Sequence, residues 1–199
     1  MGEIERMGLV SPLRAVIAVC FLGVCSCSSA ASGGDPATTT SDPICGQQCQ
    51  DDTAGYALDD TMWLLWNENI AGQPSGAQNK TVQCPLGGSA AITGTTSVAN
   101  NGISTIHLSF ALADCQNSNA TYMLTFGGAL TWDGTFGSGN PNAVTFKSTP
   151  LDVSGTIREY DMPAITESCA VALTDTYDKS SSTQSGWLNG AICGRAVSQ

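Results

Sequence analysis

The chain has 199 residues and a net charge of −10, with seven Lys and Arg against 17 Asp and Glu. Its few basic residues are dispersed, so it has no basic patch of the kind that binds nucleic acid. An acidic surface also repels phosphate and anionic lipid headgroups. Composition therefore excludes a nucleic-acid partner and is otherwise that of a globular protein.

The first 26 residues have the organisation of a secretory signal peptide. Arg6 and Arg14 supply positive charge, and an unbroken apolar run of ten residues follows, Ala15–Val24. Ten apolar residues in a helix cover only about half of a bilayer core, so this run is too short to be a transmembrane anchor. We predict that the protein is exported.

Small residues and two cysteines follow the apolar run, in the segment Val24-Cys25-Ser26-Cys27. This segment resembles the lipobox of bacterial lipoproteins, whose cysteine is lipidated and becomes the new N-terminus. The resemblance covers residues 7–34. It implies acylation of Cys27, palmitate included, and attachment to the cell envelope, and Ser28 in second place favours the outer membrane. The alternative is cleavage after Ala30, which yields a soluble product.

Residues 27–43 are rich in Ser, Thr, Gly, Ala and Pro, which predicts a flexible linker before a single folded domain, 44–199. An even number of cysteines in an exported domain predicts three disulfides. The candidates are Cys45, Cys49, Cys84, Cys115, Cys169 and Cys193. Of the possible pairings we favour Cys169 with Cys193. The alternative is a metal site that uses Cys45 and Cys49, but zinc sites favour C-x2-C pairs and histidine, so we expect no metal.

The only long helical pattern follows Asp51-Asp52-Thr53, residues suited to an N-cap and to the positive end of a helix dipole. Apolar side chains then recur at spacings of three and four, at Leu58, Met62, Leu65, Trp66 and Ile70. Gly72 and Pro74 end the pattern. This pattern predicts one helix whose aromatic-rich face packs against a sheet.

After Gln78 the sequence changes to alternating apolar and polar residues, the pattern of strands buried on one face. Residues 106–112 and 122–126 show this alternation most clearly, and Gly127-Gly128 predicts a bend or bulge in the second run. Turn signals separate further runs. We therefore predict a mainly β fold: a curved antiparallel meander or open barrel of about seven to nine strands, with the N-terminal helix packed on it.

Few residues in the sequence indicate a catalytic function. His107 is the single histidine, lies mid-strand, and has no Gly-x-Ser-x-Gly motif to accompany it, so we expect no catalytic triad. Two pairs of acids close in sequence could in principle hydrolyse a glycoside, Glu159 with Asp161 and Asp175 with Asp178. Such pairs arise by chance in an acidic chain, so we expect no enzyme and no cofactor.

Three functions remain. We favour a non-enzymatic lipoprotein of the cell envelope, held to the membrane by its lipid, with a binding or structural role and an envelope protein as possible partner. The second is a carrier that encloses a small apolar ligand in a barrel-like cavity. Its lining would be Phe110, Leu124, Phe126 and Trp132. The third is an enzyme that acts on glycans through carboxylates.

Overall fold

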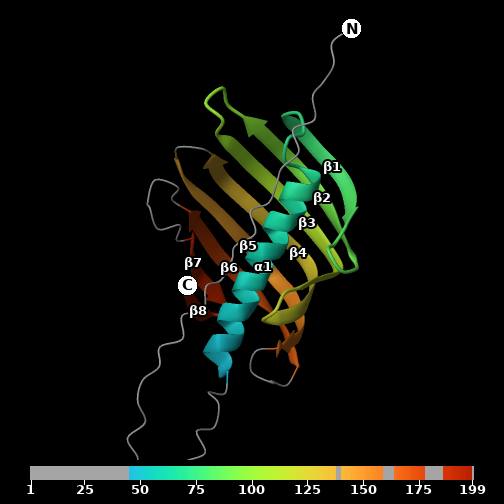
Figure 1. The fold of residues 1–199 in the computed structure, drawn as a ribbon, viewed down its shortest axis with the longest axis vertical. Helices are drawn as coiled ribbons and strands as arrows, with labels where there is room; N and C mark the ends of the chain where they lie inside the picture. The colour runs from blue at the N-terminus through green and yellow to red at the C-terminus, as the bar shows by residue number, and fades with distance from the viewer. Residues whose placement is uncertain (1–44, 138–139, 159–163, 178–185, 199) are drawn as a thin grey trace, which may run out of the picture. The chain divides into compact units, whose positions relative to one another are not determined.

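The computed structural model describes residues 45–137, 140–158, 164–177 and 186–198, which contain one helix and eight strands (Figure 1). In chain order these elements are α1 (Gln47–Asn69), β1 (Gly76–Gln83), β2 (Ser89–Val98), β3 (Ser104–Ser118), β4 (Tyr122–Gly137), β5 (Asn140–Ile157), β6 (Ile165–Tyr177), β7 (Gly186–Ile192) and β8 (Arg195–Ser198). The predicted signal peptide, Cys27 and the linker lie outside the described residues.

The eight strands form a single antiparallel meander. Each strand pairs with its sequence neighbour, so the order across the sheet is β1 to β8 without a crossover. The sheet is not closed, because β1 and β8 are its two edges and do not pair with each other. The predicted mainly β meander with one packed helix is therefore confirmed, in its open form.

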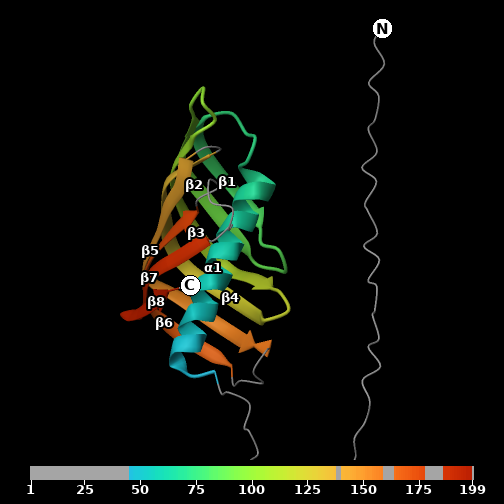
Figure 2. The ribbon, with the colours of Figure 1, turned by 60° about the vertical axis from the view of Figure 1, so that its left-hand side comes forward.

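The helix lies across one face of the sheet and contacts strands β3 to β8 (Figures 1 and 2). Along the central strands, alternate residues point toward it, and most of these are apolar. On β3 they are Ile106, Leu108, Phe110 and Leu112, all nearly inaccessible to solvent. The face toward α1, which we call the inner face, holds the hydrophobic core, and the opposite outer face carries small and polar side chains.

The start of the helix differs from the sequence expectation. Asp51-Asp52-Thr53 does not cap it: α1 begins at Gln47, with Gly46 in the cap position. The Cys45–Cys49 disulfide closes the first turn, and buried Asp51 instead binds Arg195 of β8. The predicted end is confirmed, since α1 finishes at Asn69 just before Gly72. In the described part of the chain, no helix has the length and hydropathy required to cross a membrane.

All six candidate cysteines of the domain form disulfides. The pairs are Cys45–Cys49, Cys84–Cys115 and the predicted Cys169–Cys193. The second joins β3 to the turn after β1, and the third joins β6 to the β7–β8 turn. Cys45 and Cys49 are bonded to each other, so their thiolates are not offered to the metal that the alternative interpretation required.

A bulge interrupts the long β4–β5 pair. The register shifts between Gly128 and Leu130 of β4, opposite Ser148 and Leu151 of β5. Gly128 has φ +106°, a conformation that favours glycine over any residue with a Cβ. The bend that Gly127-Gly128 predicted is therefore present, and it shapes the outer face of the sheet.

Candidate functional site

The outer face of the three central strands carries a block of polar side chains, which we call the outer polar patch. The register places His107 opposite Asp133, Ser109 opposite Thr131, Asp133 opposite Thr145, and Thr131 opposite Lys147. Side chains directly opposite one another in an antiparallel pair lie about 4.5–5.5 Å apart at Cβ. The patch therefore comprises two adjoining rows, His107–Asp133–Thr145 and Ser109–Thr131–Lys147.

His107 and Asp133 lie within hydrogen-bond distance of each other in the first row. His107 Nδ1 lies 3.0 Å from Asp133 Oδ1, and the two side chains are 66% and 44% exposed. The Thr145 hydroxyl donates to the Asp133 carbonyl oxygen at 3.2 Å. The sequence did not identify Asp133 as the partner of His107, because only the β3–β4 register brings the two together.

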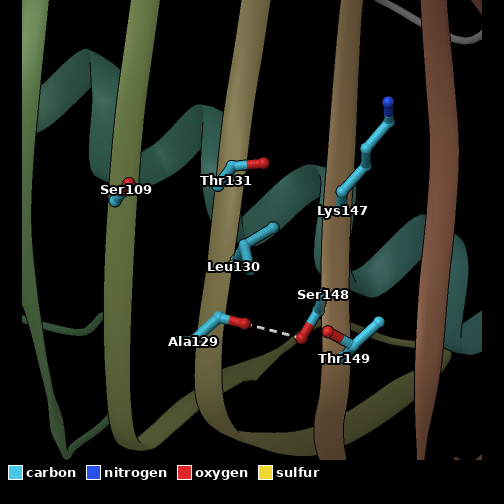
Figure 3. A pocket seen from close by; sticks show the side chains of 7 residues that line it. All are labelled: Ser109, Ala129, Leu130, Thr131, Lys147, Ser148 and Thr149. Atoms are coloured by element: carbon cyan, nitrogen blue, oxygen red, sulfur yellow. Dashed lines mark hydrogen bonds between the residues drawn. The ribbon is translucent and has the colours of Figure 1, made fainter.

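The second row borders a pocket of about 340 Å³ (Figure 3). Its lining comes from β3, β4 and β5: Ser109, Ala129, Leu130, Thr131, Lys147, Ser148 and Thr149. Figure 3 shows these residues on the strands with α1 behind the sheet, so the pocket opens on the outer face. No local sequence pattern indicates this pocket, because the bulge and the pairing of three strands create it.

The bulge explains why a pocket forms on an otherwise regular sheet. Ser148 turns inward at the register shift, is only 6% exposed, and donates through Oγ to the Ala129 carbonyl oxygen at 2.6 Å. Ala129 and Ala111 face each other across β3 and β4, so small side chains leave the backbone uncovered there. The pocket floor is thus fixed by hydrogen bonding and by the absence of bulky side chains.

Lys147 is the cation of the pocket. The other basic side chains in the described segments have polar contacts: Lys80 with the Asn69 carbonyl, Arg158 with the Asn119 carbonyl, and Arg195 with two carboxylates. Within the described residues, Lys147 makes no hydrogen bond or ion pair. Its ammonium group is therefore available to a ligand.

The contact between His107 Nδ1 and Asp133 is the one that a catalytic histidine makes with its orienting acid. Ser109 follows His107 on the same face, two residues along β3. A nucleophile must lie within about 3.2 Å of the other imidazole nitrogen. Among the residues that the structure describes, no hydrogen bond joins Ser109 to His107.

A second polar cluster lies between α1 and the inner face. Tyr122 donates its hydroxyl to Asp60 Oδ2 at 2.7 Å, and Asn117 donates through Nδ2 to Asp60, Thr61 and Tyr122 at 3.1–3.2 Å. Burial raises the pKa of the Tyr122 phenol, and its hydrogen bond to Asp60 raises that pKa further. This cluster fixes the position of the helix on β3 and β4.

The carboxyl groups of Asp59 on α1 and Asp175 on β6 lie close to each other, beside Trp63. Trp63 donates its indole N–H to Asp175 Oδ2 of β6 at 3.2 Å, and Asp59 lies one turn before Trp63 on α1. Burial, together with the charges of Asp175 and Asp60, raises the pKa of Asp59 to about 8. Burial likewise raises the pKa of Asp175. Asp59 therefore keeps its proton at neutral pH.

Spacing in the sequence could not identify Asp59 as the neighbour of Asp175. The pairs considered from sequence involved Glu159, Asp161 and Asp178, which lie outside the described residues. Asp175 itself is 6% exposed and faces the helix. The two carboxyl groups lie under α1, on the face of the sheet opposite the pocket, and we assign them to packing of the helix.

A third cluster ties the start of the helix to the last strands. Arg195 binds Asp51 through two nitrogens at 2.6 and 2.8 Å and Glu167 at 2.8 Å. Hydrogen bonding to Asp51 raises the pKa of the guanidinium. Glu167 also lies beside Cys169 and Cys193, a grouping that could hold a metal ion if the sulfurs were free. The two sulfurs are bonded to each other, so the cluster is structural.

The four residues proposed to line a cavity lie on the inner face. Phe110, Leu124, Phe126 and Trp132 are all 0–1% exposed and belong to the core under α1. Trp132 packs edge-to-face against Trp63 and Trp66 and stacks on Phe146 at 5.8 Å. The 340 Å³ pocket is on the opposite face. A carrier function for this aromatic core stays a prediction.

No protein-family model, curated protein or solved structure matches this chain. The geometry of the outer polar patch and the signals at the N-terminus are what indicate a function.

Proposed function

We propose that this protein is a non-enzymatic lipoprotein of the bacterial cell envelope whose β domain binds a ligand through its outer face. The observation that carries the binding role is the outer polar patch, in which Lys147 has no polar partner among the described residues and lies beside a pocket. The sheet that holds this patch is linked by disulfides. Rigid strands hold a site more accurately than loops do. The inner face is covered by α1, which leaves the outer face for recognition.

The cellular location rests on two independent features. Three disulfides support an oxidising compartment outside the cytoplasm. The lipobox-like segment ending at Cys27 supports attachment by an acyl chain, and Ser28 favours the outer membrane. The acidic chain has no polybasic segment to add to membrane affinity, so the anchor would depend on acylation alone.

Expression in a Gram-negative host tests the anchor. The full chain is compared with Cys27→Ser and with Cys25→Ser, which alters a cysteine two residues away. We expect the unchanged chain and Cys25→Ser to incorporate labelled palmitate and to sediment with membranes, whereas Cys27→Ser does neither. Equal labelling of all three chains, or labelling of none, contradicts the anchor.

A further inference from the structure

The pocket beside Lys147 has chemistry that selects a particular ligand, given the binding role proposed for the outer polar patch. We propose that it binds an acidic sugar, with the sugar carboxylate on Lys147 and the sugar hydroxyls on the Ser and Thr side chains. The charge of the pocket, its hydroxyl groups and its size each support this ligand.

Charge favours a ligand with one negative charge. The chain has a net charge of −10, so its surface repels anions. An anion is attracted only close to a positively charged side chain such as Lys147. Lys147 supplies one positive charge as a compact ammonium, without the planar fork with which arginine holds phosphate. A single ammonium balances a carboxylate but leaves a doubly charged phosphate half compensated.

The neighbours of Lys147 leave its side chain free to reach a ligand. It faces Thr131 on β4 and Ala172 on β6, both shorter than lysine. In Figure 3 its ammonium extends along the outer face, away from Ser148 and Thr149. A long, flexible side chain between short ones can turn toward a carboxylate held over the pocket.

Hydroxyl groups favour a sugar over a simple carboxylate. Ser109, Thr131 and Thr149 each present a hydroxyl that both donates and accepts, which matches the hydroxyls of a sugar ring. These hydroxyls lie beside the apolar side chains of Ala129 and Leu130, so the pocket offers both polar and apolar contacts to a sugar ring. Its volume of about 340 Å³ is at the small end of ligand pockets, as expected for a single sugar unit.

The first row of the outer polar patch sets the orientation of the sugar in the pocket. Asp133 lies two residues from Thr131 on the same face of β4 and would repel a carboxylate placed over it. The sugar carboxylate is therefore directed to the Lys147 side of the pocket and the hydroxyls to the Ser109 side.

Titration of the full-length protein, purified with its disulfides intact, tests this proposal. The probes are glucuronate, glucose as its neutral counterpart, acetate as a carboxylate without hydroxyls, and inorganic phosphate. Calorimetry gives the Kd, and amide chemical shifts of residues 109, 131 and 147 locate the binding. We expect glucuronate to bind about tenfold more tightly than each of the other three.

Two variants assign the effect to Lys147. Lys147→Gln removes the charge and keeps a polar side chain, and we expect it to weaken glucuronate binding about tenfold. Lys80→Gln removes a charge on the inner face, away from the pocket, and we expect an unchanged Kd. Circular dichroism checks that both variants are folded.

The proposal is overturned if glucuronate binds no more tightly than glucose, acetate or phosphate. It is also overturned if Lys147→Gln and Lys80→Gln lose glucuronate affinity equally, or if the amide chemical shifts change outside the pocket. None of these bears on acylation at Cys27, which is measured separately. Failure of the sugar ligand and failure of the envelope anchor are therefore distinguishable.

Discussion

The buried carboxyl group of Asp59 predicts that the protein loses stability as the pH rises through neutrality. Burial beside Asp175 holds the Asp59 pKa at about 8 in the folded protein, against 3.8 for an ordinary aspartate. Between these two values the folded state binds a proton that the unfolded chain has released. Because the folded state binds more protons, the free energy of unfolding falls as the pH increases across this range.

The size of this stability loss follows from the pH interval between the pKa values of Asp59 in the unfolded and folded states. Each pH unit inside it lowers the free energy of unfolding by about 1.4 kcal/mol, so raising the pH from 5 to 7 removes about 2.7 kcal/mol. The pKa of Asp175 is also raised by burial, so its contribution has the same sign. Asp59→Asn has nearly the shape of the protonated acid and cannot ionise, so the Asp59 contribution to this slope disappears.

Urea unfolding at pH 5, 6 and 7, followed by tryptophan fluorescence with the disulfides intact, measures the effect. We expect Asp59→Asn to be more stable than the unchanged protein at pH 7 and to show a flatter dependence on pH. Asp152→Asn, which changes an exposed aspartate on β5, is the matched control and should keep the original slope. Identical slopes for the unchanged protein and Asp59→Asn would refute this account of the buried pair.

Three further predictions concern the fold. Tyr122→Phe removes the hydroxyl bound to the helix carboxylate and should lower the free energy of unfolding by about 1–3 kcal/mol, measured by urea unfolding at pH 6. Replacing both Cys84 and Cys115 by Ala opens a loop of 31 residues and should cost about 3–4 kcal/mol in the same assay; an unchanged midpoint would contradict it. Gly94→Ala puts a Cβ against the His107 carbonyl oxygen at φ +128° and should lower the Tm, whereas Gly127→Ala, whose Cβ would make only ordinary contacts, should lower it less.

Local patterns in the sequence predict most of the fold. Period-two alternation identifies the inner face of β3 correctly, because a one-residue slip would expose Leu108 and Phe110 and bury His107. The Gly127-Gly128 bend and the Cys169–Cys193 pair are also found in the structure. These features are set within one strand or between strands that lie close in sequence.

The features that sequence could not supply depend on contacts between distant residues. The helix begins before Asp51 because that carboxylate binds Arg195, 144 positions along the chain, and is unavailable as a cap. The His107–Asp133 contact depends on the β3–β4 register, and the Lys147 pocket on a bulge between two strands. Each of these arises from tertiary structure, which local propensity does not specify.

Intact mass spectrometry of the native protein extracted from membranes tests whether this is an exported, lipid-anchored β domain. We expect a chain that begins at Cys27, is heavier by its acyl groups, and is lighter by the six hydrogens lost in forming three disulfides. A protein that retains Met1 or Met7, carries no acyl group and has six reduced cysteines in its β domain would contradict it.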